Sequence, residues 1–456
     1  MSLLNRRIVK KGLLPEKVLQ FGTGVLLRGL PDYFIEKANR AGLFGGSIVV
    51  IKSTDKGGAD LFKQQDNVYT IHIKGIQNGE EVEEALVVSA ISRVVTAASE
   101  WQTVLDVARS PEVEVVISNT TEVGIVFDEQ DDLSTFPPRS FPGKLTAVLW
   151  ERFRTFKGAD DKGLVILPTE LIDKNGETLR DTILTLAEHN RLGNDFSDWV
   201  KTSNYFCNTL VDRIVPGSLD AAGQEQAEAL LGYRDELAIM AEPFCLWAIE
   251  TEHPRVEALL SFAKADSRVV ITPDISKFKE LKLRLLNGSH TFACGLAIHA
   301  GFETVREAMA NDAFSTFVAR LMHQEIIPTL IEGGGISATD AGTFANQVVD
   351  RFRNPYLDHK WESISLNYTS KMKMRNLATL ERAAERQQRG GMDYMALGFA
   401  GYLVAMAKTT PLQLLADWEA DLVPLGGFIP LVKKYVEQLR QRPAQQVLEE
   451  LNAVKI

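Results

Sequence analysis

The chain has 456 residues, of which 45% are hydrophobic and 24% are charged, a composition that is ordinary for a globular protein of about two or three domains. Its formal net charge of −10 argues against nucleic acid and against an anionic membrane as partners, since both bind basic surfaces. The three cysteines, Cys207, Cys245 and Cys294, form no CxxC pair. We therefore expect no disulfide framework, no thiolate metal site and a reducing, cytoplasmic setting.

Strand and helix patterns alternate through the first part of the chain. Short apolar runs bounded by turn residues predict strands, and apolar residues at helical spacing predict helices. Such alternation is typical of βαβ units and a parallel sheet. In chain order we expect strands at 16–21 and 47–52, a hairpin around Asn78 and Gly79, a helix at 101–108, a strand at 113–120, a helix at 145–156, a strand at 163–171 and a helix at 177–190.

A glycine turn follows the first of these strands, in VLQFGTGVLLRG. Gly22 and Gly24 stand between a strand and a helix, where a GxG turn can cradle a pyrophosphate against the free N–H groups of the helix. The third glycine of the usual GxGxxG pattern would fall at Leu27, and Arg28 could supply positive charge beside the phosphates. A plain strand-to-helix turn is the alternative interpretation.

The end of the second strand bears on the choice of dinucleotide. An acidic residue that binds the adenosine ribose usually stands there, but this strand ends in Lys52, Ser53 and Thr54, and Asp55 comes later. Lys52 could equally favour a 2′-phosphate, so the residues alone leave NAD and NADP open.

The character of the chain changes near residue 271, after which strand patterns almost vanish and helical patterns continue to the end. We therefore expect an α/β domain with a parallel sheet over 1–270, followed by a mostly α-helical domain over 271–456. A cleft between two such domains is a common place for a ligand.

The segment KLRLLNGSH, residues 282–290, breaks the rules of an ordinary helix, because Asn287 and Gly288 interrupt a run of good helix formers. At 100° per residue, Asn287 lies about 140° from Lys282, with Lys279 and His290 between them, so all four share one broad face. A lysine can act as a general base, an asparagine can stabilise a developing alkoxide and a histidine can orient a hydroxyl. These parts suit the oxidation of a secondary alcohol without a metal, and a solvated polar face is the alternative.

Six motifs occur in the order found in the mannitol dehydrogenase family of polyol-specific long-chain dehydrogenases: FGTGVLLRG, SNTTEVGI, NTLVDRIVPG, AEPFCLWAIE, KLRLLNGSH and RFRNPYLDH. The chain resembles that family over nearly its whole length. The resemblance implies a Rossmann-type domain, a helical C-terminal domain and metal-independent NAD chemistry. The candidate cofactor contacts are Phe21, Gly22, Thr23, Gly24, Arg28, Lys52, Asn119, Thr120 and Glu122.

The same resemblance assigns roles to four residues. It implies that Lys282 is the acid–base group, that Asn287 and Asn208 form the oxyanion hole, and that His290 orients a substrate hydroxyl. The family's glutamate, three residues before the lysine, is replaced by Lys279, so the proton path must differ.

Within the family, the motifs SNTTEVGI, ELIDKNG, VDRIVPG, EIIPTL and FRNPY resemble the branch that acts on sugar acids. They imply NAD-dependent interconversion of D-tagaturonate and D-altronate in hexuronate catabolism. Reduction of fructuronate, oxidation of mannitol and non-catalytic nucleotide binding are the alternatives. The scattered histidines lack paired-ligand spacing, so we expect no metal site. The candidate contacts for the substrate carboxylate are Lys279, Arg353, Lys371, Lys373 and Arg375, with a solvated basic face as the alternative.

Overall fold

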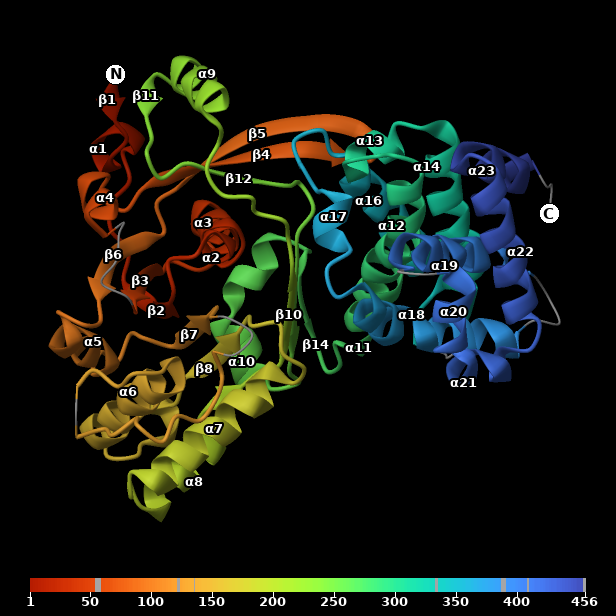
Figure 1. Cartoon of the computed structure of the whole chain (residues 1–456). Coiled ribbons are helices and arrows are strands. Elements are labelled where there is room, and N and C mark those ends of the chain that lie inside the picture. The colour runs from red at the N-terminus through yellow and green to blue at the C-terminus, as the bar shows by residue number, and fades with distance from the viewer. Residues whose placement is uncertain are drawn as a thin grey trace. The chain divides into compact units, whose positions relative to one another are not determined.

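The computed structural model describes residues 1–53, 59–120, 124–134, 136–332, 335–386, 391–407 and 410–453. They form two compact units (Figure 1). The first unit comprises Met1–Lys74 and Glu83–Ile275, and the second comprises Gly75–Val82 and Ser276–Ile456. The chain therefore changes units at Ile275, and the short segment Gly75–Val82, which is the tip of a hairpin, belongs to the second unit.

A parallel sheet with the strand order β6-β3-β2-β7-β8-β9 is the centre of the first unit. Numbered along the chain, these strands lie in the order 3-2-1-4-5-6, which is the order of a doubly wound dinucleotide-binding fold. The predicted Rossmann-type domain is thus confirmed. The strands are β2 (Glu16–Phe21), β3 (Ser47–Lys52), β6 (Ile91–Thr96), β7 (Val115–Ser118), β8 (Val165–Pro168) and β9 (Tyr205–Phe206).

Both faces of this sheet are buried. Successive residues of a strand point to opposite faces, so each face has its own apolar cluster. Val18 packs in one apolar cluster with Phe34, and its neighbour Leu19 packs in another with Leu145. Helices cover the two faces (Figure 1). The helices of this unit are α1 (Arg6–Val9), α2 (Val25–Gly29), α3 (Pro31–Arg40), α4 (Ala59–Gln64), α5 (Trp101–Ala108), α6 (Phe141–Phe156), α7 (Asn175–His189), α8 (Asn194–Ser203), α9 (Ala221–Leu231) and α10 (Pro254–Leu259), with short 3-10 turns η1 (Asp160–Lys162) and η2 (Ser261–Ala265).

Three smaller sheets complete the strand structure: β10-β13-β14, β12-β4-β5 and β1-β11. The predicted hairpin is confirmed, since Asn78 and Gly79 join β4 to β5 with positive φ at both residues, 55° and 78°. Two positive φ values are the signature of the tight turn that suits twisted strands. These strands are β1 (Ser2–Leu3), β4 (Tyr69–Gln77), β5 (Glu80–Val88), β10 (Thr209–Asp212), β11 (Tyr233–Arg234), β12 (Ile239–Ala241), β13 (Leu246–Glu250) and β14 (Val269–Thr272).

The second unit is helical, apart from the hairpin tip, as predicted. Its central helices α12 and α19 are apolar on nearly all sides, which is typical of buried helices. No helix in the described part of the chain is both long and apolar enough to cross a membrane. The helices are α11 (Ser276–Leu281), η3 (Lys282–Gly288), α12 (Ser289–His299), α13 (Val305–Met309), α14 (Asp312–Arg320), η4 (Leu321–Ile326), α15 (Ile327–Ile331), α16 (Ala338–Arg353), α17 (Trp361–Ile364), α18 (Tyr368–Glu385), α19 (Asp393–Met406), α20 (Pro411–Ala416), α21 (Glu419–Leu422), η5 (Val423–Leu425), α22 (Phe428–Gln441) and α23 (Ala444–Ala453).

Candidate active site

The glycine turn lies where β2 passes into α2. Gly22 has φ +124°, and a Cβ atom there would lie 2.9 Å from Leu27 Cδ1 and 3.2 Å from the carbonyl oxygen of Asn119. Only glycine fits this backbone without strain. Gly24 precedes α2, and no atom of the described residues lies within 4 Å of the position that its Cβ would take. The turn therefore combines a tight bend with open space beside the start of a helix, which is what close approach of a pyrophosphate requires.

The loop after β7 faces the same end of the sheet, because β2 and β7 are parallel neighbours. In doubly wound sheets, the crevice between these two strands is the usual ligand site. Asn119 donates to the carbonyl oxygen and the hydroxyl of Thr169, at 3.1 and 3.0 Å. Thr120 donates through its backbone N–H and its hydroxyl to Glu170 Oε1, at 2.9 and 3.0 Å. Glu122 lies outside the described residues.

Glu170 is a residue that the sequence analysis missed. It is almost fully buried and also accepts from Ser118 Oγ at 3.1 Å. Burial raises its pKa, against the opposing effect of these hydrogen bonds. Its carboxyl group thus fixes the loop that carries Asn119 and Thr120. The available signal was a carboxylate two residues after the apolar strand that becomes β8.

The two predicted cationic cofactor contacts are placed differently. Lys52 ends β3 and is buried, with 6% of its surface exposed. Arg28 donates to the carbonyl oxygen of Leu237 at 2.8 Å, and its guanidinium lies over the rings of Phe62 and Tyr69. The charge of Arg28 is therefore directed into the interior of the unit, and the predicted phosphate contact receives no support.

Asn208 lies in the connection between β9 and β10 and is buried. Its amide oxygen accepts from the backbone N–H groups of Gly176 and Glu177, at 3.1 and 3.2 Å. Its amide nitrogen donates to Glu177 Oε1 at 3.1 Å and to Glu250 Oε1 at 2.9 Å. Both hydrogens of the predicted oxyanion donor are thus engaged by carboxylates.

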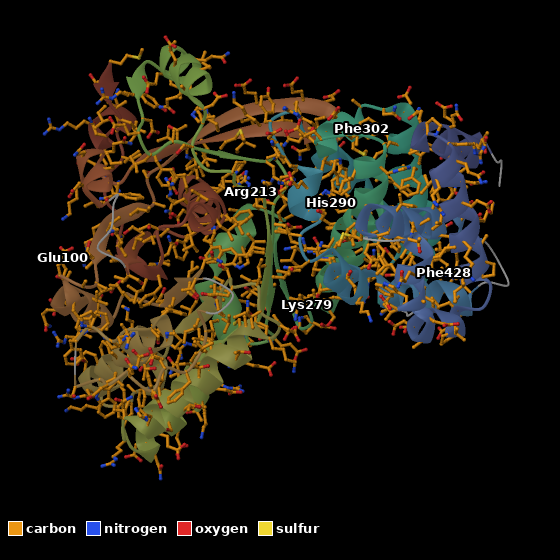
Figure 2. All side chains as sticks on the ribbon, in the orientation of Figure 1. Glu100, Arg213, Lys279, His290, Phe302 and Phe428 are labelled. Carbon is orange, nitrogen blue, oxygen red and sulfur yellow. The ribbon has the colours of Figure 1, made fainter. Side chains whose placement is uncertain are left out.

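The anomalous segment Lys282–Gly288 is a π-helix, inserted between the α-helical segments α11 and α12. The predicted wheel at 100° per residue is therefore wrong here, because a π-helix pairs residues i and i+5. That spacing separates Lys282 from Asn287, and the wider turn brings these two positions closer to one face than an α-helix would. Such bulges occur frequently at functional sites. Lys279 precedes the bulge, in the last turn of α11 (Figure 2).

Gly288 is explained by close packing against α18. A Cβ atom at this position would lie 2.9 Å from Asn376 Oδ1 and 3.8 Å from the carbonyl oxygen of Arg375. That carbonyl also accepts from Arg284, at 2.8 Å. The small residue lets α18 approach the bulge, and the bulge is thereby fixed from one side.

Glu280 stands beside the position of the family's glutamate, but it is engaged elsewhere. Its carboxylate pairs with Arg284 at 3.3 Å and with Arg382 at 2.7 Å. Burial by itself would raise the pKa of Glu280, but the hydrogen bonds from Arg382 and Arg284 outweigh it and lower the pKa. A carboxylate held ionised between two arginines is poorly suited to relay a proton.

His290 lies in the first turn of α12 (Figure 2), between aromatic side chains. Its ring stacks on Phe352, with centroids 4.5 Å apart, and meets the edge of Trp361 at 5.2 Å. The Nε2 atom is shielded from water and has no hydrogen-bond partner in the part of the chain that the structure describes. Burial lowers the pKa of His290 to about 3. The positive charges of four basic side chains contribute to this lowering: His359, Arg375, Arg351 and Lys371.

The residues of the predicted basic cluster lie on two different faces of α18. Lys371 donates to the carbonyl oxygen of Ile364 at 2.8 Å, and Arg375 donates to Thr291 Oγ1 at 3.2 Å. Lys373, halfway between them, is paired with Asp421 at 2.9 Å. Since residues four apart share a helix face, Lys371 and Arg375 act together near His290 whereas Lys373 does not.

The predicted Arg353 is exposed and donates to Ser315 Oγ at 2.7 Å. Arg351, two residues earlier on α16, is buried and is one of the bases that act on His290. Arg351 is a residue that the sequence analysis passed over, and the substrate contact of Arg353 stays a prediction.

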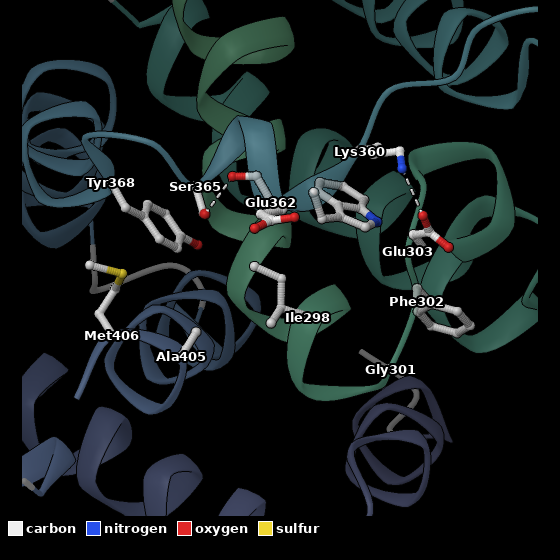
Figure 3. A pocket seen from close by; sticks show the side chains of 11 residues that line it. Ile298, Gly301, Phe302, Glu303, Lys360, Glu362, Ser365, Tyr368, Ala405 and Met406 are labelled. Atoms are coloured by element: carbon white, nitrogen blue, oxygen red, sulfur yellow. Dashed lines mark hydrogen bonds and ion pairs between the residues drawn. The ribbon is translucent and has the colours of Figure 1, made fainter. Parts of the chain in front are cut away.

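A cavity of about 450 Å³ has Trp361, Tyr368 and Ile298 in its lining (Figure 3). Its wall includes Phe302, Met406 and the ion pair between Lys360 and Glu303, at 2.9 Å. It is lined by none of the residues that the sequence predicts for catalysis or substrate binding. Within the described ranges, no three histidine, cysteine or carboxylate side chains are grouped as metal ligands would be.

The strand order and the glycine turn define the class: a Rossmann-type dinucleotide fold followed by a helical unit. Comparison with known families agrees, since the mannitol dehydrogenase Rossmann domain matches residues 16–259 and the mannitol dehydrogenase C-terminal domain matches residues 274–411. The chain belongs to the mannitol dehydrogenase family, as its motifs predict.

Individual relatives are similar over most of their length. The altronate oxidoreductase of Bacillus subtilis strain 168 is 40% identical over 374 residues, which are 82% of this chain and 76% of the relative. The altronate oxidoreductase of Yersinia enterocolitica is 38% identical over 426 residues, 92% of this chain and 86% of the relative.

Two solved structures share the fold. A D-sorbitol dehydrogenase in substrate-free form aligns with TM-score 0.79 and 19% identity, covering 98% of this chain and all of the other. The Pseudomonas fluorescens mannitol 2-dehydrogenase, in a ternary complex with NAD and D-mannitol, aligns with TM-score 0.70 and 23% identity over 99% of each chain.

Proposed function

We propose that this protein is an NAD-dependent oxidoreductase that interconverts D-tagaturonate and D-altronate. The family and the altronate oxidoreductase relatives support the reaction class. The observation that carries the choice of a sugar acid is the surroundings of His290. The Nε2 atom of this imidazole is shielded from water and lacks a partner among the described residues, and the charges of Arg375, Arg351 and Lys371 contribute to lowering its pKa.

The first unit fits a dinucleotide. The bend at Gly22, the open space at Gly24 and their position at the end of β2 match the needs of a pyrophosphate, and the fold is shared with a mannitol 2-dehydrogenase solved with NAD. Asn119, held by Thr169, would lie along the same crevice. NAD, when bound, accepts or supplies the hydride.

The second unit would supply the proton chemistry. In the direction of reduction, Lys282 in its protonated form donates a proton to the keto oxygen as the carbonyl carbon gains a hydride, and the lysine regains a proton from solvent. Asn287, five residues on, donates a hydrogen bond to the same oxygen while negative charge develops there. The π-helix gives these two positions their common face.

Asn208 is proposed as the second donor to that oxygen. Because Glu177 and Glu250 occupy both of its N–H bonds, one of these carboxylates must release Asn208 when substrate binds. The network also fixes the orientation of the amide, since the oxygen is held by two backbone N–H groups. An amide that is oriented in advance costs little reorganisation during the reaction.

His290 would bind a substrate hydroxyl. A neutral imidazole with a shielded, unpartnered Nε2 atom gains most from a hydrogen bond that arrives with the substrate, because an unpaired buried polar group is costly. The substrate carboxylate would bind the neighbouring cations Lys371, Arg375 and Arg351. Charge-assisted hydrogen bonds of this kind are the strong ones.

The proposal is tested by separating binding from turnover. D-Tagaturonate and NADH should yield D-altronate and NAD in equal amounts, and NAD should oxidise D-altronate in the reverse direction. Lys282→Ala should lower kcat by about 10²- to 10⁴-fold, since a general acid is lost, and should leave the Kd for NADH nearly unchanged. Binding of NADH without turnover of any keto-uronate by the wild type would instead favour a non-catalytic nucleotide-binding protein.

A further inference from the structure

The oxygen of the Asn208 amide is fixed by the start of α7. This helix begins without a side-chain cap from the residue before it, Lys174. Asn208 Oδ1 takes that place, because it accepts from the free backbone N–H groups of Gly176 and Glu177, at 3.1 and 3.2 Å. The absent side chain of Gly176 permits this approach, since a Cβ there would lie 2.6 Å from the carbonyl carbon of Cys207. The orientation of the amide therefore does not depend on the carboxylate of Glu177.

The nitrogen of the same amide has two hydrogens, and each is directed to a carboxylate. Nδ2 of Asn208 lies 3.1 Å from Glu177 Oε1 and 2.9 Å from Glu250 Oε1. A side-chain amide can donate two hydrogen bonds through its nitrogen. A substrate oxygen can therefore accept from Asn208 only after it has replaced one of the two carboxylates.

The two carboxylates are held to different degrees. Glu250 also accepts through Oε2 from the backbone N–H of Ile275 at 3.3 Å, and its own backbone N–H donates to the carbonyl oxygen of Asn208 at 2.9 Å. The side chain of Glu177 is 41% exposed, and its second oxygen lies 3.4 Å from the exposed Lys174 Nζ. Exposed ion pairs of this kind contribute little. Glu177 can therefore turn toward water at a smaller cost than Glu250.

Glu177 is ionised where it meets the amide. The hydrogen bond from Asn208 is the main cause that lowers the pKa of Glu177, and the positive charges of Lys174 and Arg180 add to it against the effect of burial. A negative charge beside Asn208 is unfavourable for a substrate oxygen that gains negative charge during the reaction. Departure of Glu177 from the amide would thus remove both a competing acceptor and an opposing charge.

We infer that Glu177 competes with the substrate for Asn208: its carboxylate occupies one N–H of the amide in the free protein and turns toward solvent when the keto oxygen arrives. The inference rests on the proposed role of Asn208 in the reduction of a keto sugar acid. Glu250 keeps the other hydrogen, and the start of α7 keeps the amide oxygen, so the released N–H remains oriented. Glu177 is therefore a positioning residue that limits the efficiency of the reaction.

The test is kcat/KM for D-tagaturonate with NADH at neutral pH. Glu177→Ala should raise it by about two- to tenfold, which is the net contribution of a typical hydrogen bond, whereas loss of a residue that only supports the fold would lower it. Glu177→Gln, which keeps an acceptor oxygen but no charge, should raise it by a smaller factor. Asp181→Ala is the matched control, since it removes the same charge one turn later on α7, where Asp181 pairs with Arg180 at 2.9 Å, and it should leave kcat/KM unchanged.

A double-mutant cycle shows whether the effect passes through Asn208. In an Asn208→Ala background, Glu177→Ala should change kcat/KM by less than about twofold, because the contested N–H is gone. The inference is overturned if Glu177→Ala, or Glu177→Gln should the first variant not fold, has a kcat/KM equal to or below that of the wild type. A rise that persists without Asn208, or an equal rise in Asp181→Ala, would also overturn it. Failure of the wild type to reduce any keto-uronate would instead overturn the proposed function.

Discussion

Replacing the cations of α18 one at a time tests how the second unit selects its substrate. Lys371 and Arg375 lie on the face of the helix that acts on His290, whereas Lys373 lies on another face and pairs with Asp421. We expect Arg375→Met and Lys371→Met to lower kcat/KM for D-tagaturonate far more than for D-fructose, a ketose without a carboxylate. Lys373→Met is the matched control, since it removes the same charge from the same helix.

The size of the effect follows from the desolvation of these groups. Arg375 is partly buried, and this burial lowers its pKa. A hydrogen bond to a charged group contributes about 1.5–3 kcal/mol net, and 1.36 kcal/mol is a factor of ten in rate. Each of the two variants should therefore lose about tenfold to over a hundredfold in kcat/KM with the uronate. With fructose, which offers no carboxylate, the loss should be less than about threefold.

The assay is the initial rate of NADH oxidation with each substrate, for the wild type and the three variants, with thermal melting as a check of the fold. A loss in Lys373→Met as large as in Arg375→Met would mean that general charge, and not a defined contact, attracts the substrate. Equal losses with tagaturonate and fructose in Arg375→Met would refute the assignment of this residue to the carboxylate.

Three further changes test the neighbourhood of the bulge. Asn287→Ala should lower kcat by about 10²- to 10³-fold with little change in KM, because an oxyanion donor acts mainly after charge has developed; a change confined to KM would contradict this role. The pKa of His290 falls from 6.5 to about 3 on folding, so this residue binds a proton more readily in the unfolded chain. The free energy of unfolding should therefore fall by about 1.4 kcal/mol per pH unit as the pH drops from 6 toward 4. In denaturant titrations, His290→Asn should remove the contribution of this residue to that pH dependence. Gly288→Ala should destabilise the protein by about 1–3 kcal/mol, because its Cβ meets Asn376 Oδ1 at 2.9 Å, whereas Gly342→Ala in the open middle of α16 should be neutral or stabilising; similar melting temperatures for both would refute the packing argument.

The sequence was sufficient for the fold because its signals are local. The strands at 16–21 and 47–52 lie where predicted. In β3 every residue is buried, and a strand that is buried on both faces has a nearly continuous apolar sequence, which is easy to recognise. The hairpin was predictable from Asn78 and Gly79, which both tolerate positive φ. The change to helices after residue 271 needed no knowledge of tertiary contacts.

The site was harder to predict, because the direction in which a side chain points depends on helix geometry that residue patterns do not contain. The wheel assumed 3.6 residues per turn, but packing of α18 against Gly288 accompanies a π-helix, so the angular positions after Lys282 were wrong. Asn287 and Gly288 nevertheless marked the segment as unusual. The roles of Lys282, Asn287 and His290 remain predictions.

Arginine positions show the same difficulty. Arg353 and Arg351 stand two residues apart on α16, and only the buried stripe of the helix distinguishes them. Arg351 lies three residues after the buried Val348, on the inward side, which was a usable signal. No comparable signal indicated that the side chain of Arg28 points into the interior of the unit, because its partners Leu237 and Tyr69 are distant in sequence.

The central claim is that the protein reduces a keto-uronate with NADH, and the most direct measurement compares kcat/KM for D-tagaturonate, D-fructuronate and D-fructose, each with NADH and NADPH. The account predicts that tagaturonate with NADH has the highest value, and that fructose is reduced at least tenfold less efficiently, because it leaves the cations beside His290 without a carboxylate. Reduction of fructose with the same efficiency as tagaturonate would contradict the account and would favour a mannitol dehydrogenase.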